Sequence, residues 1–355
     1  MVSYQNPQVQ ADLAELLQQN IPWQQLKNKT LLITGATGML ASYVGFTLLF
    51  LNEKLSLNIH PVFLARNKSK LETVYGEALG QAHTLVQDVC DPIGYEGNVD
   101  YIFHAAGAAS PYYILNDPVG IINANVKGTQ NVLELARTVG TKNIAFASTR
   151  EIYGKVENKT LINENDMGTL DPLSPRDCYP ESKRLAEALF MAYYQQHKVN
   201  FNSLRIAHSY GPGMQLEGDG RVMSDFMNDA VNGRDIIMKS TGEAERAFCY
   251  ITDAVSGIFR VLLQGQPAQA YNLANESEPI RLVDLANLLQ RSAGKGKGVK
   301  IDIPESQAGY TNYTRTALCT KKIEQLGWEL EVNLEDGLKR TLRSFGVNGE
   351  YCCKK

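Results

Sequence analysis

Short apolar runs alternate with longer amphipathic segments along the first 207 residues. The apolar runs predict buried strands at residues 29–34, 58–65, 84–87, 99–104, 142–147 and 202–206. The segments between them repeat apolar residues at helical spacing, which predicts helices at residues 39–51, 69–79, 122–139 and 182–197. Strands that alternate regularly with helices are typical of an α/β fold with a doubly wound parallel sheet.

The pattern breaks up after residue 207. Glycine and charge increase over residues 211–220, and the predicted helices at 282–291 and 334–345 lie among loops. We therefore predict a smaller C-terminal α/β lobe over residues 208–350, with some segments returning to the first domain at residues 28–207. Residues 1–27 form an N-terminal extension in which Leu13, Leu16 and Leu17 predict a short helix. The pattern leaves open whether this helix packs on its own chain or on a partner subunit.

Composition narrows the class of protein. The chain has 355 residues, is 44% hydrophobic and carries a net charge of -3, which supports a large core and argues against nucleic-acid binding. Its six cysteines show no CxxC pair and no histidine spacing typical of zinc, so we expect reduced thiols and no metal site. The N-terminus does not resemble a signal peptide, and the longest apolar run, residues 39–51, is too short to span a membrane. We expect a cytoplasmic protein without membrane contact.

A glycine-rich segment, TGATGMLA at residues 34–41, joins the first predicted strand to the first helix. Gly35 permits a tight turn, Gly38 lets a pyrophosphate approach the backbone, and Ala41 allows close packing of helix on sheet. This setting predicts a Rossmann-type dinucleotide-binding domain. The expected phosphate contacts are Gly35, Thr37, Gly38, Met39 and Leu40.

The remaining cofactor contacts are expected at the ends of the following strands. The second strand ends at Arg66 instead of the acidic residue that holds the ribose of NAD. Arg66 could meet a 2′-phosphate, stack on adenine or face solvent, so NAD is the expected cofactor and NADP stays compatible. The other expected contacts are Asp88, Val89, Ala105, Ala106, Gly107, Asn125, Tyr179 and Lys183.

Tyr179 and Lys183 stand four residues apart, which places phenol and ammonium on one face of the helix that follows. The lysine charge would lower the pKa of the phenol and make it a base for a sugar hydroxyl. The alternative is a surface tyrosine and lysine on an amphipathic helix.

A second polar segment, Thr149-Arg150-Glu151, ends the fifth predicted strand, at the edge where parallel sheets bind ligands. Thr149 could share an oxygen with Tyr179, Glu151 could move a proton at the neighbouring carbon, and Arg150 could hold an anion. The alternatives are a turn or helix cap for Thr149 and a surface ion pair between Arg150 and Glu151.

Together these residues resemble the extended short-chain dehydrogenase/reductase family, which modifies nucleotide sugars, over about residues 29–342. Several stretches are most similar to UDP-glucuronate decarboxylases. They are residues 108–111, 148–154, 178–184, 210–212, 219–226 and 246–253, of which the DGRV run at 219–222 discriminates best.

The resemblance implies that NAD oxidises the sugar at C4, with Tyr179 as base, Lys183 tuning it and Thr149 assisting. Loss of CO2 from the 4-keto acid would follow, and Glu151 would transfer the proton at C5. Arg221 and Arg246 would grip the nucleotide diphosphate, because a guanidinium binds phosphate in a bidentate fork. Ser110 and Val222 complete the expected substrate contacts.

Three residues depart from the family pattern. Arg150 replaces the usual serine of decarboxylases or aspartate of dehydratases, and a permanently protonated guanidinium is a poor proton donor for dehydration. It could instead pair with a sugar carboxylate, or hold that carboxylate too firmly for CO2 to leave. His208 replaces an asparagine that faces substrate or nicotinamide, and Arg66 replaces the ribose-binding acid.

The favoured function is decarboxylation of UDP-glucuronate by an NAD-dependent enzyme. Epimerisation, 4,6-dehydration and C4 oxidation of another nucleotide sugar are the alternatives, and a non-catalytic dinucleotide-binding protein is a more distant one. The resemblance also implies a homodimer formed through the helices at residues 122–139 and 182–197, and a role in polysaccharide biosynthesis.

Overall fold

The first domain is built on a seven-stranded parallel sheet. The computed structural model describes residues 2–294, 298–303 and 316–347. Its strands run in the order β12-β7-β5-β4-β1-β2-β3, which confirms the predicted doubly wound α/β fold. They are β1 (Thr30–Thr34), β2 (His60–Ala65), β3 (His83–Val86), β4 (Tyr101–His104), β5 (Asn143–Thr149), β7 (Phe201–Ile206) and β12 (Gln269–Leu273).

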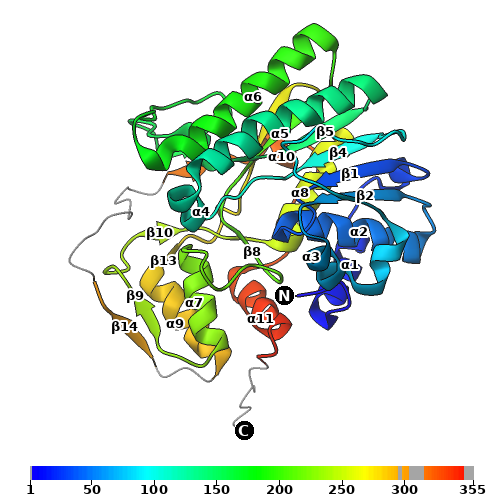
Figure 1. Ribbon diagram of the computed structural model, residues 1–355. Coiled ribbons are helices and arrows are strands. Elements are labelled where there is room, and N and C mark those ends of the chain that lie inside the picture. The colour runs from blue at the N-terminus through cyan, green and yellow to red at the C-terminus, as the bar shows by residue number, and fades with distance from the viewer. Residues whose placement is uncertain (1, 295–297, 304–315, 348–355) are drawn as a thin grey trace.

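Helices cover both faces of this sheet (Figure 1). On one face lie α2 (Met39–Leu55), α8 (Ile251–Gln264) and α1 (Pro7–Gln18), and on the other α5 (Pro118–Val139) and α6 (Cys178–His197). Successive side chains of a strand point to opposite faces. Accordingly Leu31 and Ile33 of β1 join the core beneath α2 and α8, whereas Leu32 joins the core beneath α5 and α6.

Some predicted boundaries differ from the structure for local reasons. The helix predicted at 122–139 begins earlier, at Pro118, because the Asp117 side chain accepts a hydrogen bond from the Gly120 N–H. The helix predicted at 182–197 begins at Cys178, which places Tyr179 in its first turn. The helix predicted at 69–79 is α3 (Lys68–Tyr75), and a 3-10 turn continues from Gly76, whose φ is +57°.

The second lobe lies beside the carboxyl ends of the strands (Figure 1). Its main helices are α7 (Val222–Val231), α9 (Leu282–Ala293) and α11 (Leu334–Ser344). The short helices α4 (Pro111–Asn116) and α10 (Lys321–Glu324) contact α5 and β12 of the first domain. Pairs of short strands connect them: β8 (Ser209–Tyr210) with β11 (Cys249–Tyr250), β9 (Ile236–Met238) with β14 (Val299–Ile301), β10 (Glu245–Arg246) with β13 (Ile280–Arg281), and β6 (Leu161–Ile162) with β15 (Ala317–Leu318). Between these pairs, α8 and β12 return to the first domain, and the last residues of the predicted lobe, 348–350, lie outside the described residues.

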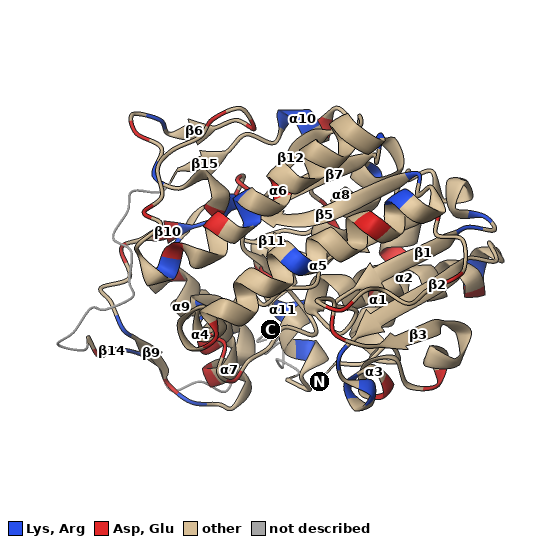
Figure 2. Cartoon of the chain, turned by 45° about the horizontal axis from the view of Figure 1, so that its top comes forward, with Lys and Arg blue, Asp and Glu red and all other residues tan. Residues whose placement is uncertain are grey.

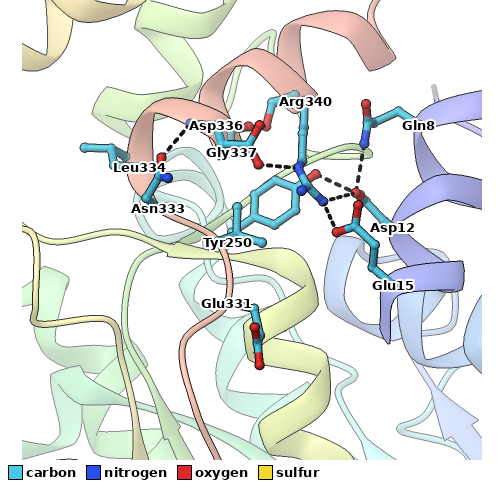
Figure 3. Close-up of polar contacts among 12 residues, drawn as sticks. Gln8, Asp12, Glu15, Tyr250, Glu331, Asn333, Leu334, Asp336, Gly337 and Arg340 are labelled. Atoms are coloured by element: carbon cyan, nitrogen blue, oxygen red, sulfur yellow. Dashed lines mark hydrogen bonds and ion pairs between the residues drawn. The ribbon is translucent and has the colours of Figure 1, made fainter. Parts of the chain in front are cut away.

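The N-terminal extension packs on its own chain. Asp12 of α1 is fully buried and accepts hydrogen bonds from the phenols of Tyr43 (3.0 Å) and Tyr250 (2.7 Å). It also pairs with Arg340 of α11 at 3.3 Å, and Gln8 donates to it from the preceding turn (Figure 3). One carboxylate therefore ties the extension to α2, to α11 and to the strand that precedes α8.

Replacing Asp12 with alanine should lower the free energy of unfolding by about 2 kcal/mol, because two buried phenols and a guanidinium lose their acceptor. Denaturant titration of both proteins measures the difference. Glu15→Ala is the matched control, because Glu15 binds the same Arg340 from the exposed side of α1. This substitution should lower the free energy of unfolding by no more than about 0.5 kcal/mol. Equal losses in the two variants would contradict the role assigned to Asp12.

Candidate active site

The glycine-rich segment forms the turn between β1 and α2. Gly35 has a φ of +68°, and a Cβ added there would lie 2.9 Å from the carbonyl oxygen of Ala105. Gly38 is the N-cap of α2, and no side chain caps that helix end. Thr37, Met39 and Leu40 are half-buried around it. The end of α2 therefore offers backbone N–H groups to an anion, which fits a dinucleotide pyrophosphate.

At the edge of the sheet, Arg66 after β2 pairs with Asp88 after β3 at 3.6 Å. Asp88 also accepts a hydrogen bond from the Cys90 N–H, and this bond and the Arg66 charge hold the pKa of its carboxyl below the usual value. The neighbouring Val89 is buried against Gly128 of α5. Arg66 thus has a negative partner at the place where a ribose 2′-oxygen is expected.

The segment after β4 closes tightly against α5 and α6. Gly107 has a φ of +137°, and a Cβ there would lie 2.7 Å from Oδ1 of the buried Asn125. Asn125 donates to Ser182, which in turn donates to the Tyr179 carbonyl, so the chain at Gly107 is linked to the start of α6. Oδ1 of Asn125 and Oγ of Ser110 are buried without a protein partner among the described residues. Unpartnered buried polar atoms beside Ala105, Ala106 and Gly107 fit a site that takes a polar ligand.

Tyr179 and Lys183 are both buried in the first turns of α6. The Lys183 ammonium donates to the Ala147 carbonyl at 2.8 Å and lies 4.6 Å from the ring centre of Phe146. Burial lowers its pKa to about 7, and the nearby Glu187 opposes that shift. The alternative of a surface tyrosine and lysine is therefore wrong.

The predicted lowering of the phenol pKa is also wrong for the protein by itself. Burial raises the pKa of Tyr179, and the charge of Glu151 raises it further. The opposing effects come from a hydrogen bond with Thr149 and from the charges of Arg221 and Arg176, and Lys183 is not among the largest influences. The physical reason is that desolvation of the phenolate outweighs the attraction of these neighbours.

Thr149, Arg150 and Glu151 follow the end of β5, and their partners come from other segments. The Thr149 hydroxyl caps the short 3-10 turn η3 (Arg150–Tyr153) by accepting from the Glu151 N–H at 3.2 Å, and it also bonds Tyr179. Arg150 does not pair with Glu151: its Nη2 donates to the Thr316 carbonyl at 3.1 Å. The partner of Glu151 is Arg176, at 2.8 Å.

The charges of three arginines act on His208, which follows β7 with a φ of +42°. Burial lowers the pKa of His208 to about 3, and the charges of Arg150, Arg246 and Arg221 lower it further. The ring is therefore neutral near pH 7, and its Nδ1 donates to the Ala247 carbonyl at 3.2 Å, so Nε2 stays an acceptor. Asp219 grips Arg221 with both carboxylate oxygens, directly before Val222 opens α7. The structure thus gathers positive charge beside a neutral hydrogen-bond acceptor.

Sequence reasoning missed the partners that organise these residues. Arg176 and Asp219 were not singled out, although Arg176 stands three residues before Tyr179 and Asp219 two before Arg221. A charged residue within one helical turn of a predicted site residue could have indicated these ion-pair partners. Basic and acidic residues are otherwise interspersed along the chain in Figure 2. Within the described part of the chain, no helix is both long and apolar enough to cross a membrane.

A glycine turn at a helix N-terminus, with a buried Tyr-Lys pair and a threonine at the carboxyl end of the sheet, defines a dinucleotide-dependent enzyme of the Rossmann class. The model of the NAD dependent epimerase/dehydratase family matches residues 31–274, and the chain belongs to this family. UDP-glucuronic acid decarboxylase 5 of Arabidopsis thaliana is 33% identical over 314 residues, which cover 88% of this chain and 87% of that protein. UDP-glucuronic acid decarboxylase 1 of Xenopus tropicalis is 34% identical over 328 residues, which cover 91% and 73%.

Solved structures share the fold. A UDP-glucose 4-epimerase of Thermotoga maritima, with UDP-glucose, superposes with a TM-score of 0.75 and 23% identity, over 89% of this chain and 98% of that one. A dTDP-glucose 4,6-dehydratase of Streptomyces venezuelae, with NAD and TYD bound, superposes with a TM-score of 0.76 and 24% identity, over 90% and 97%. Epimerases and dehydratases thus share this architecture, and the reaction has to be argued from the site.

Proposed function

We propose that this enzyme decarboxylates UDP-glucuronate. The observation that carries the proposal is that the charges of Arg150, Arg221 and Arg246 all act on the buried ring of His208, and that the charge of Arg221 also acts on Tyr179, which bonds Thr149. A nucleotide sugar acid brings a diphosphate and a carboxylate, and this much positive charge suits both. The decarboxylases that the chain resembles over most of its length support the same substrate.

NAD is the proposed cofactor, held by Gly35, Thr37, Gly38, Met39 and Leu40 at the pyrophosphate. Asp88 lies 3.6 Å from Arg66, so its negative charge disfavours a 2′-phosphate at that place and favours NAD over NADP. When bound, NAD would supply the hydride acceptor for C4 and a positive charge near the phenol. The rest of the chemistry falls to side chains of this chain.

Tyr179, with Thr149 on the same oxygen, takes the proton from the C4 hydroxyl. The resulting ketone is β to the carboxylate, so the bond from C5 to the carboxyl carbon breaks and CO2 leaves. Glu151 then donates a proton to C5. Tyr179 returns its proton to the C4 oxygen when the hydride returns to C4. Arg150 pairs with the carboxylate before it leaves, and its fixed positive charge makes it unsuited to the proton donation that dehydration needs.

Incubation of the purified protein with a panel of nucleotide sugars, UDP-glucuronate first, tests the proposal. CO2 release with no net change in the absorbance of reduced cofactor is the expected result, and product mass should show the loss of CO2. Loss of water would instead favour dehydration, and an isomer of unchanged mass would favour epimerisation. Accumulated reduced cofactor would identify a C4 dehydrogenase, and no reaction with any sugar would favour a binding protein.

We also propose a homodimer formed through α5 and α6, whose outer faces carry exposed apolar residues such as Ile122 and Leu185. Leu185→Glu should convert a dimer to a monomer, because a carboxylate would be buried in the interface. Light scattering at micromolar concentration measures the mass. Gln195→Glu, exposed on the same helix, is the control and should stay dimeric. A wild-type monomer would refute the proposal.

A further inference from the structure

We propose that Arg176 is a positioning residue for the reaction at C5, because it holds the side chain of Glu151 in place. This inference rests on the proposed function, since it assigns Glu151 to the C5 proton. Arg176 lies in the 3-10 turn η4 (Pro175–Asp177), directly before α6. The turn thus connects the residue that grips Glu151 to the residue that carries the phenol, Tyr179.

The geometry fixes Glu151 from two sides. Its backbone N–H donates to the Thr149 hydroxyl at 3.2 Å, and its Oε2 accepts from Nη2 of Arg176 at 2.8 Å. With Oε2 engaged, Oε1 is the oxygen left to exchange a proton with substrate. The adjacent Arg150 does not pair with Glu151, and its Nη2 donates to the Thr316 carbonyl instead.

Stability alone does not account for this ion pair. The side chains of Arg176 and Glu151 are 39% and 36% exposed, and an ion pair so open to solvent contributes little to stability. Nη1 of Arg176, by contrast, is buried and lacks a hydrogen-bond partner among the described residues. An unpartnered buried guanidinium nitrogen beside a reacting centre indicates a residue placed for chemistry.

The same pair acts on the phenol. Glu151 raises the pKa of Tyr179 and Arg176 lowers it, so the two charges offset each other at the base. Loss of Arg176 would therefore disturb both proton-transfer groups. The side chain of Glu151 would lose its position, and the pKa of Tyr179 would rise. The larger effect should fall on the reaction at C5, because Arg176 contacts Glu151 directly.

The step at C5 balances as follows. The pair of electrons from the broken bond to the carboxyl carbon stays on C5 and the C4 oxygen as an enolate, and CO2 departs. Glu151, protonated from solvent, gives that proton to C5 and becomes a carboxylate again. A displaced Glu151 would leave the enolate to be protonated by water, and the 4-keto pentose would then escape before hydride returns.

A double-mutant cycle tests this coupling. Arg176→Gln should lower the turnover of UDP-glucuronate by about 100-fold, with little change in KM, and raise the share of released 4-keto product. Arg176→Lys should recover part of the turnover, because it keeps a cation near Oε2. In the Glu151→Gln background, Arg176→Gln should change turnover by less than about threefold. Arg234→Gln, which removes an exposed pair with Asp229, is the matched control.

A binding measurement separates positioning from substrate contact. In the Tyr179→Phe background, calorimetry should give a Kd for UDP-glucuronate that Arg176→Gln changes by less than about threefold. An equal fall in turnover with and without Glu151, or a Kd weakened about tenfold, would overturn the proposal. In heavy water, solvent deuterium should enter C5 of UDP-xylose with wild-type enzyme and far more slowly with Arg176→Gln.

The exchange measurement also keeps the two proposals apart. If UDP-glucuronate stays intact while UDP-xylose or another nucleotide sugar exchanges its C5 hydrogen with solvent, that result refutes the proposed function. The double-mutant cycle of Arg176 and Glu151, measured on this exchange, would then still test the role of Arg176. If no nucleotide sugar exchanges at C5, the role of Arg176 is refuted as well.

Discussion

Tyr179→Phe should reduce turnover by about 1,000-fold, because it removes the oxygen that takes the proton from the C4 hydroxyl. The ring itself should stay in place, since it packs in a small apolar cluster with Ile114 and Ile121. CO2 release and the absorbance of reduced cofactor, followed together, measure the loss. Cofactor binding should be unchanged, because the phosphate contacts lie at the distant turn after β1.

Tyr194→Phe is the matched control for this variant, since it removes a phenol from the same helix, α6. Its turnover should stay close to that of the wild type. A Tyr179→Phe protein with undiminished turnover would refute decarboxylation, epimerisation, dehydration and C4 oxidation together, because all four reactions need the same base.

Lys183→Met should reduce turnover by about 100-fold and remove one limb of the pH profile. Burial lowers the pKa of Lys183 to about 7, so the side chain loses its proton, and with it its charge, as the pH rises through about 7. If the charged lysine supports the phenolate, kcat/KM of the wild type should therefore acquire a falling limb above pH 7. The methionine variant should lack that limb, because it has nothing to titrate there.

The pH dependence of kcat/KM for both proteins measures this effect. Lys68→Met removes an exposed ammonium and should leave the profile unchanged. Methionine at position 183 also leaves the Ala147 carbonyl without its donor, so a thermal melt should accompany the kinetics. A profile that keeps its falling limb in Lys183→Met would show that another group titrates near pH 7.

The strand β12 and the helix α8 were not predicted from the sequence. Residues 269–273, QAYNL, alternate too little to predict a strand, and their place beside β7 depends on pairing with a segment far away in the chain. The helix before them, residues 251–264, is buried nearly all round, including the face that carries Asp253, Ser256 and Arg260, and polar residues at helical spacing do not by themselves predict such burial. Both belong to the sheet domain only because long-range packing places them there.

The alternation of strands and helices, the glycine turn and the four-residue spacing of Tyr179 and Lys183 could all be predicted from the sequence. These features depend on backbone geometry within one element or one turn, which local sequence encodes. Three features could be found only in the folded chain: Glu151 pairs with Arg176, Asp12 joins α1 to Tyr250 and Arg340, and burial raises the pKa of Tyr179. Ion pairs and desolvation depend on which distant segments meet and how much water they exclude, and no local pattern records either quantity.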